Sequence, residues 1–278
     1  MRDPDRLGLS WRLPTGTAML QFVLAVLLTF SISTFFSMFG KGGGELYLPV
    51  LLTLLNMSYF QAATLSLLMI TLQGLSMLPV YSRRHGLLDW ALALMLGGVV
   101  ALSSFLGGFI SYEVPASLLK LCFSLILAVS AVLILAKKEF RGVKFLSIRR
   151  RVGDTEYDLQ ILLIIPPVAL AAFLAGMAGI SGGGLIVPLC VILGGVPLRV
   201  AMATNSFLVI SSSSMSLLGH VLRGGLDIGL GAVFGLTVVI GAQLGARMHT
   251  RIGDREMRWL FSLILLSAAA WMLIRTLA

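Results

Sequence analysis

Two glycine-rich segments of this chain have a composition suited to binding anions. Residues 41–49 read KGGGELYLP and residues 180–188 read ISGGGLIVP. Consecutive glycines let the backbone turn sharply and leave N–H groups that no side chain covers. A helix that begins directly after such a turn adds partial positive charge from its N-terminus. Each segment therefore predicts a place where backbone amides bind a small anion, although the glycines could also serve only as hinges or packing points.

Neutral polar side chains follow both glycine segments at matching positions. Aligning Pro49 with Pro188 places Ser66 on Asn205, roughly 12 Å into the next apolar stretch and near the depth where transporter sites usually lie. Hydroxyl and amide groups suit an oxyanion that must be released again, although they also form hydrogen bonds between helices. Lys41 could add a full positive charge, or it could pair with Glu45 one helical turn away. The predicted substrate-binding residues are Lys41, Gly42, Gly43, Gly44, Thr64, Ser66, Ser181, Gly182, Gly183, Gly184, Thr204 and Asn205.

The composition of the chain shows what must position these residues. Of its 278 residues, 58% are hydrophobic and 12% are charged, about half the charged fraction of a soluble domain. This composition excludes disordered, collagen-like and disulfide-stapled chains. It predicts an integral membrane protein surrounded by lipid.

Long apolar runs predict an all-α integral membrane protein with about eight transmembrane helices, because a span needs about 20 apolar residues. The predicted spans are 17–39, 58–80, 88–110, 116–136, 159–179, 198–220, 226–247 and 257–275. Two shorter runs, 46–55 and 185–194, each cover about half a bilayer and predict half-helices. Small residues spaced along 88–110 and 226–247 predict close helix packing.

The order of these elements predicts two four-helix repeats, each with a glycine-rich break and a short half-helix. Broken helices at corresponding positions of an internal duplication are typical of transporters. The predicted organisation is a cytoplasmic segment 1–16, a first transmembrane repeat 17–136, a basic cytoplasmic linker 137–158 and a second repeat 159–278. Whether the repeats are parallel or inverted stays open. The distribution of Lys and Arg favours both termini on the cytoplasmic side, with a basic cluster at 247–258 that does not fit.

Other chemistry is poorly supported by the sequence. Residues 179–183 match G-x-S-x-G, but the strand–turn–helix context of a serine hydrolase is missing, so an intramembrane protease using Ser181 is a weak alternative. The three histidines fall at predicted span ends, where a solvated position is expected. No carboxylate lies in the middle of a predicted span to carry a proton. Nothing in the sequence indicates a cofactor, a metal site or nucleic-acid binding.

At the glycine segments the chain resembles the sulfite exporter TauE/SafE family. The resemblance rests on residues 40–44 with Pro49 and on residues 179–184 with Pro188, and is extended by residues 201–206 and 223–227. It implies export of a small sulfur-containing anion, such as sulfite or an organosulfonate, across the inner membrane. We therefore expect a multi-pass secondary transporter with a small anionic substrate. A non-transport scaffold or assembly protein is the alternative, and homo-oligomer formation stays open.

Overall fold

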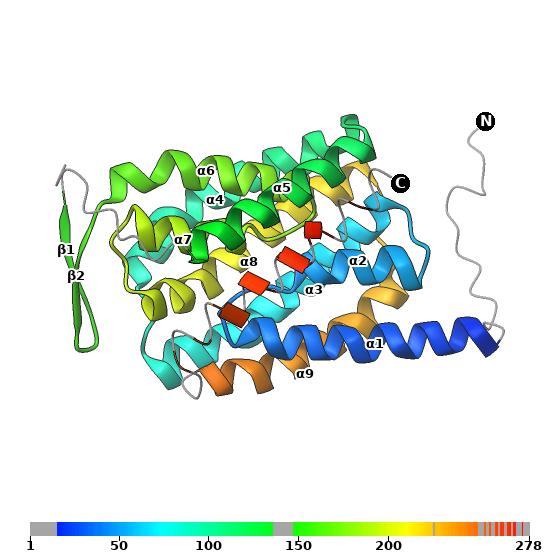
Figure 1. The fold of residues 1–278 in the computed structure, drawn as a ribbon, viewed down its shortest axis with the longest axis horizontal. Coiled ribbons are helices and arrows are strands. Elements are labelled where there is room, and N and C mark those ends of the chain that lie inside the picture. Colours follow the sequence, from blue (N-terminus) through cyan, green and yellow to red (C-terminus); the bar gives the residue numbers. More distant parts are fainter. Residues whose placement is uncertain are drawn as a thin grey trace.

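The computed structural model describes residues 16–135, 147–224 and 226–249, with scattered positions after 249. This part of the chain is helical except for one short hairpin (Figure 1). The longer helices are α1 (Gly16–Ser37), α3 (Tyr59–Pro79), α4 (Trp90–Ile110), α5 (Ala116–Leu135), α8 (Leu198–Arg223) and α9 (Ile228–Met248). The shorter helices are α2 (Gly44–Leu54), α6 (Ile161–Met177) and α7 (Gly183–Ile192).

Five helical stretches are long and apolar enough to cross a membrane. They are Thr17–Ser37, Tyr59–His85, Trp90–Glu113, Leu198–Arg223 and Ile228–Met248. The chain is thus a mostly helical, multi-pass membrane protein. The described residues do not support the predicted count of eight spans: α6 has only 17 residues because the helix ends before the second glycine segment. The predicted span 257–275 lies largely outside the described residues.

The two short apolar runs form short helices. α2 has 11 residues and α7 has 10, so each is about 15 Å long. Each contains one proline in its second turn, Pro49 or Pro188, and each begins at a glycine. These helices follow the glycine segments directly, as the sequence predicted.

Helix starts are fixed by side chains that accept hydrogen bonds from free backbone N–H groups. Ser58 caps α3 and, with Gln61, forms a capping box. Asp89 caps α4 by accepting from the N–H of Leu92, and Asp227 caps α9 in the same way.

The predicted basic linker contains an unexpected β-hairpin. Strands β1 (Ile148–Val152) and β2 (Thr155–Leu159) pair antiparallel, with Arg150 directly opposite Tyr157. Gly153 supplies the positive φ of 57° in the turn. Figure 1 shows the hairpin at one end of the helical bundle, beyond α6 and α7. The prediction of a simple loop was wrong here because Tyr157 and Leu159 are buried, which anchors the strands to the helices.

Glycines bring the helices of the bundle into close contact. α4 packs on α6 and α8, and α1 packs on α9. A Cβ atom at Gly107 would lie 2.1 Å from the Phe173 carbonyl oxygen, and one at Gly245 would lie 1.8 Å from the Thr34 carbonyl oxygen. No side chain fits at either position, so these glycines set the spacing of α4 from α6 and of α9 from α1.

Candidate substrate site at the two glycine breaks

Two non-helical segments interrupt the bundle, and both cross the opposite half of the chain. The first break is residues 38–43, between α1 and α2, and the second break is residues 178–182, between α6 and α7. Gly40 and Gly179 have φ values of 63° and 76°, which disfavour any residue with a side chain. A Cβ atom at Gly40 would lie 1.9 Å from the Met202 carbonyl oxygen on α8. One at Gly179 would lie 2.5 Å from the Ala63 Cβ on α3, so each break is pressed against a long helix.

The first break is held by Gln73 of α3. Its Oε1 accepts from the Gly43 N–H at 3.0 Å and from the Tyr47 hydroxyl at 2.9 Å. Its Nε2 donates to Ser37 Oγ at 2.8 Å and to the Lys41 carbonyl oxygen at 3.3 Å. A single buried amide therefore satisfies donors and acceptors from both ends of the first break.

The second break is held by small side chains of α8. Ser212 donates to the Ser181 carbonyl oxygen at 2.8 Å, and Ser216 donates to the Gly176 carbonyl oxygen at 3.0 Å. His220 Nε2 lies 3.3 Å from the same Gly176 oxygen. These contacts satisfy carbonyl groups that would otherwise be orphaned where α6 ends.

A buried ion pair lies at the first break. Lys41 Nζ is 2.7 Å from Glu45 Oε1, and both side chains are at most 1% exposed. The Lys41 ammonium also lies over the Phe36 ring, 5.5 Å from its centroid. Of the two predicted roles of Lys41, the structure shows the pairing with Glu45, and it places the pair inside the protein rather than at an open mouth. Glu45 is thus a buried carboxylate that the analysis of span centres missed, because it lies on a half-helix.

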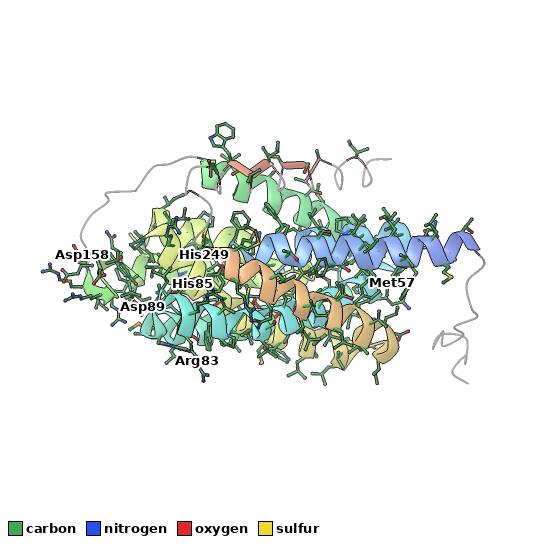
Figure 2. The ribbon with its side chains drawn as sticks, turned by 90° about the horizontal axis from the view of Figure 1, so that it is seen from below. Met57, Arg83, His85, Asp89, Asp158 and His249 are labelled. Atoms are coloured by element: carbon green, nitrogen blue, oxygen red, sulfur yellow. The ribbon has the colours of Figure 1, made fainter. Side chains whose placement is uncertain are left out.

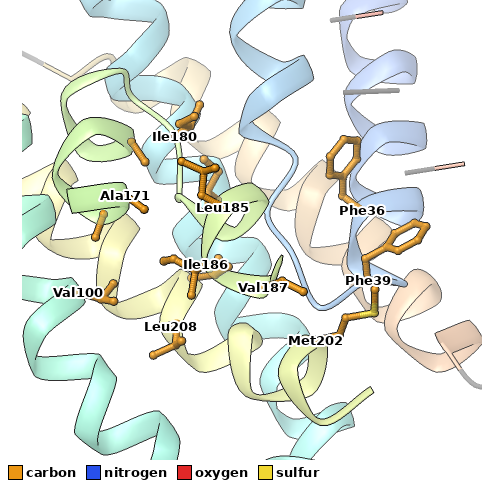
Figure 3. Packing of buried hydrophobic residues seen from close by; sticks show 14 of the residues in the cluster. Phe36, Phe39, Val100, Ala171, Ile180, Leu185, Ile186, Val187, Met202 and Leu208 are labelled. Atoms are coloured by element: carbon orange, nitrogen blue, oxygen red, sulfur yellow. The ribbon is translucent and has the colours of Figure 1, made fainter. Parts of the chain in front are cut away.

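The two breaks meet at their second halves. A Cβ atom at Gly183 would lie 2.7 Å from Asn205 Nδ2 and 3.2 Å from Lys41 Cγ. One at Gly44 would lie 3.4 Å from Ser66 Oγ. Figure 3 shows the apolar surroundings, with Phe36 and Phe39 on one side, Met202 next to Phe39, and Ile180 and Leu185 across from them. Glycines of both breaks therefore leave room beside the charged pair and the polar side chains of α3 and α8.

Three polar atoms in this region have no hydrogen-bond partner among the described residues. They are Ser66 Oγ, Ser181 Oγ and Asn205 Oδ1. All three residues are at most 1% exposed. Asn205 also donates from Nδ2 to the Gly40 carbonyl oxygen at 2.9 Å, so one side of its amide is occupied and the other is not. Buried polar groups are almost always paired, so a cluster of unpaired ones marks a place where a polar ligand or water binds.

Some predicted site residues have other contacts. Thr64 donates to the Phe60 carbonyl oxygen of its own helix. Thr204 Oγ1 accepts from the Asp89 N–H at the start of α4. Space at Gly42 is filled by Ile70, and Gly182, with φ of 68°, begins α7 against Ala175. Gly184 is buried within the first turn of α7.

Gln73 and Ser212 were not among the predicted site residues, although the sequence contained a signal for them. They lie 139 residues apart, the same offset that relates Pro49 to Pro188. The histidine prediction was wrong for two residues, since His220 is 2% exposed and His249 is fully buried. Both ring systems bind backbone carbonyls, of Gly176 and Met38, and such contacts depend on tertiary packing.

The hairpin is joined to the bundle through Asp89, which lies at the hairpin end of the molecule (Figure 2). Asp89 Oδ1 lies 2.6 Å from Arg150 Nη2, and Oδ2 accepts from the Tyr157 hydroxyl at 2.6 Å. Burial by itself would raise the pKa of Asp89, but hydrogen bonds from Arg150, Tyr157 and the Leu92 N–H, with the Arg150 charge, outweigh it and hold that pKa below its usual value. Burial and the bond to Asp89 raise the pKa of Tyr157. This cluster adjoins Thr204, the residue before Asn205, so the hairpin is coupled to the site through α8.

Serine-protease chemistry is not supported by this geometry. Ser181 lies in a break between helices, and within the described residues its hydroxyl has no partner that could act as a base. The two cysteines, Cys122 and Cys190, are free thiols. Among the described residues no group of three or more His, Cys, Asp or Glu side chains could hold a metal ion.

Long apolar helices, two broken segments and a buried polar cluster between them define a membrane transporter rather than an enzyme. Comparison with known proteins agrees: the family described as sulfite exporter TauE/SafE matches residues 24–272. The chain belongs to this family of membrane transporters.

Named relatives cover the chain to different extents. "Probable membrane transporter protein YunE" of Bacillus subtilis (strain 168) is 26% identical over 253 residues, which are 86% of this chain and 90% of that protein. "Probable membrane transporter protein MJ0441" of Methanocaldococcus jannaschii is 21% identical over 259 residues, 87% of this chain and 91% of that protein. "Sulfite exporter TauE/SafE family protein 1" of Arabidopsis thaliana is 42% identical over 94 residues, 34% of this chain and 21% of that protein. No solved structure matches the chain.

Proposed function

We propose that this protein is a secondary transporter that exports a small sulfur-containing oxyanion, sulfite or an organosulfonate, across the cell inner membrane. The anion would bind between two halves of the chain at the two breaks. The observation that carries the proposal is the cluster of unpaired buried atoms, Ser66 Oγ, Ser181 Oγ and Asn205 Oδ1, beside the Lys41–Glu45 pair.

The chemistry of this cluster fits an oxyanion. The two serine hydroxyls can donate to anionic oxygens, and Lys41 supplies positive charge close to them. Asn205 Oδ1 is an acceptor, which suits a water molecule or a protonated oxygen such as that of hydrogensulfite. The surrounding apolar side chains exclude bulk water and strengthen these interactions.

A duplicated architecture of two four-helix halves is part of the proposal, and contacts that recur at a fixed offset support it. Tyr81 donates to the Ser37 carbonyl oxygen at 2.8 Å, and His220, 139 residues later, contacts that of Gly176, also 139 residues later. The pair Gly40–Met202 has its counterpart in Gly179–Ala63, with the roles of the halves exchanged. Gly107 on Phe173 and Gly245 on Thr34 form a third such pair. Each half thus contributes one break to a shared central site.

The test is flux in proteoliposomes with labelled sulfite, methanesulfonate, sulfoacetate, taurine and sulfate. We expect protein-dependent release of at least one sulfur oxyanion. Gly183→Leu should abolish it, since even a Cβ atom there lies 2.7 Å from Asn205 Nδ2. Gly98→Leu is the matched control, because a Cβ at this exposed position of α4 meets nothing within 4 Å.

A scaffold without transport activity predicts no flux of any of these anions. The same null result, with binding unchanged in Gly183→Leu, would remove the proposed function. Ser181→Ala separates the protease alternative, since a transporter keeps measurable flux without this hydroxyl.

A further inference from the structure

Glu45 is a carboxylate in the interior of a membrane protein, next to the proposed anion site. It lies on the first turn of α2, and its side chain is 1% exposed. Buried carboxylates in membrane segments are rare and usually functional, because their charge is costly to bury. Its partner Lys41 is also the cation closest to the polar cluster, since Lys41 Cγ borders the space at Gly183.

Few other ionisable groups face Glu45. α1 and α3 are the helices packed against α2, and neither contains Asp, Glu, Lys, Arg or His. The tyrosines of these elements are engaged elsewhere: Tyr47 donates to Gln73 and Tyr59 donates to the Ala178 carbonyl oxygen. On the side of the second break, residues 178–182 contain no ionisable side chain. Within the described structure, the charge of this region is therefore set by Lys41 and Glu45.

Charge neutrality then limits what this region can bind. With Lys41 protonated and Glu45 ionised, the pair has no net charge. An added monoanion would leave one uncompensated negative charge in a desolvated site, which costs several kcal/mol. Protonation of Glu45 removes that charge and releases the Lys41 ammonium to pair with the anion.

We propose that Glu45 is the proton-binding group of the transporter and that each monoanion is carried together with one proton. This inference rests on the proposed function. One proton adds to the Glu45 carboxylate to give the neutral acid, and the anion replaces that carboxylate beside Lys41. On release the proton and the anion leave together, and the Lys41–Glu45 pair forms again. The region is neutral in both states, so transport moves no net charge.

The test uses methanesulfonate in proteoliposomes of the whole protein. This anion comes from a strong acid and cannot carry the proton itself. We expect a pH difference of one unit, acidic outside, to accumulate methanesulfonate about tenfold inside. A potassium diffusion potential of about 59 mV, set with valinomycin at equal pH, should leave the ratio near one, whereas a simple anion uniporter would reach tenfold at that potential.

Glu45→Gln keeps the shape of the side chain and removes the proton site. We expect it to retain exchange of labelled for unlabelled methanesulfonate and to lose the tenfold pH-driven accumulation. Glu45→Asp should keep the accumulation ratio, with a lower rate. Glu113→Gln is the matched control, because Glu113 pairs with Arg223 at the end of a helix and its side chain is 65% exposed. That variant should behave like the wild type.

The outcomes separate the coupling from the proposed function. Potential-driven accumulation by the wild type, or full pH-driven accumulation by Glu45→Gln, overturns the role of Glu45 and leaves anion transport intact. Loss of exchange in folded Glu45→Gln also overturns it, since an uncoupled carrier must still exchange. If Glu45→Gln does not fold, the wild-type comparison of pH and potential decides. Absence of methanesulfonate flux overturns the coupling, and sulfite flux in the same vesicles shows whether the proposed function fails with it.

Discussion

The two glycine breaks have the same backbone design and different chemistry. Both follow a long helix, pass through a glycine with positive φ and start a short helix with a proline in its second turn. The first break carries the Lys41–Glu45 pair and is held by one amide, Gln73. The second break has Ile180 where the first has Lys41, and it is held by hydroxyl groups of α8. The backbone design thus creates the space, and charge is added from one side only.

The largest expected difference between the breaks comes from the charged pair. Lys41→Met leaves the Glu45 carboxylate buried without its counter-charge and should lower stability by about 3–5 kcal/mol. The double variant Lys41→Met with Glu45→Leu, which gives the first break the apolar character of the second, should recover most of this loss. Thermal unfolding in detergent measures both. A single variant as stable as the wild type would show that the pair is not desolvated.

The glycines with positive φ give the next largest effect. Gly40→Ala combines a left-handed conformation, which disfavours side chains by roughly 1–2 kcal/mol, with a clash against a backbone carbonyl. Gly179→Ala has the same conformational penalty, but its closest neighbour is the Ala63 methyl group. We expect Gly40→Ala to be the more destabilising, with Gly98→Ala neutral or slightly stabilising. The reverse order in unfolding experiments would mean that the first break relaxes more easily than the second.

The side chains that hold the breaks should differ by a smaller amount. Gln73→Leu orphans the Gly43 N–H, the Tyr47 hydroxyl and Ser37, so we expect a loss of roughly 2–3 kcal/mol. Ser212→Ala removes one interhelical hydrogen bond and should cost about 0.6 kcal/mol. Equal losses would indicate that the second break depends on Ser212 as fully as the first depends on Gln73.

The smallest expected effect concerns the helix starts that follow the breaks. Asp89 caps α4 and is bound by the hairpin, whereas Asp227 caps α9. Arg150→Met should cost roughly 1–2 kcal/mol, a modest value because the Arg150 side chain is 30% exposed. Because the native pKa of Asp89 is lowered, its contribution is present above the unfolded-state pKa of about 4 and is lost as pH falls through the native value.

Unfolding temperatures between pH 3 and pH 6 test this assignment. Asp89→Asn should remove part of the acid-induced decrease. Asp227→Asn serves as the control for loss of charge at a cap. An unchanged pH profile in Asp89→Asn would place the acid-sensitive group elsewhere.

Most of the helical architecture and half of the site chemistry could be predicted from local sequence. Apolar runs of sufficient length indicated five helices that the structure shows as long enough to cross a membrane, and the shorter runs indicated α2 and α7. Of the predicted site residues, Ser66, Ser181 and Asn205 lie buried and unpaired beside the glycines. Thr64 and Thr204 have partners elsewhere, because a hydroxyl's partner depends on which helix faces it.

The sequence by itself determined which segments are apolar enough for lipid and where the backbone can break, since both follow from side-chain hydrophobicity and from glycine's missing Cβ. Only the tertiary structure decided that Lys41 and Glu45 are buried together, that Gln73 holds the first break, and that Asp89 binds a hairpin strand 61 residues away. These features depend on which surfaces face each other after packing. Burial then decides whether a polar group is solvated, paired or left available for a ligand.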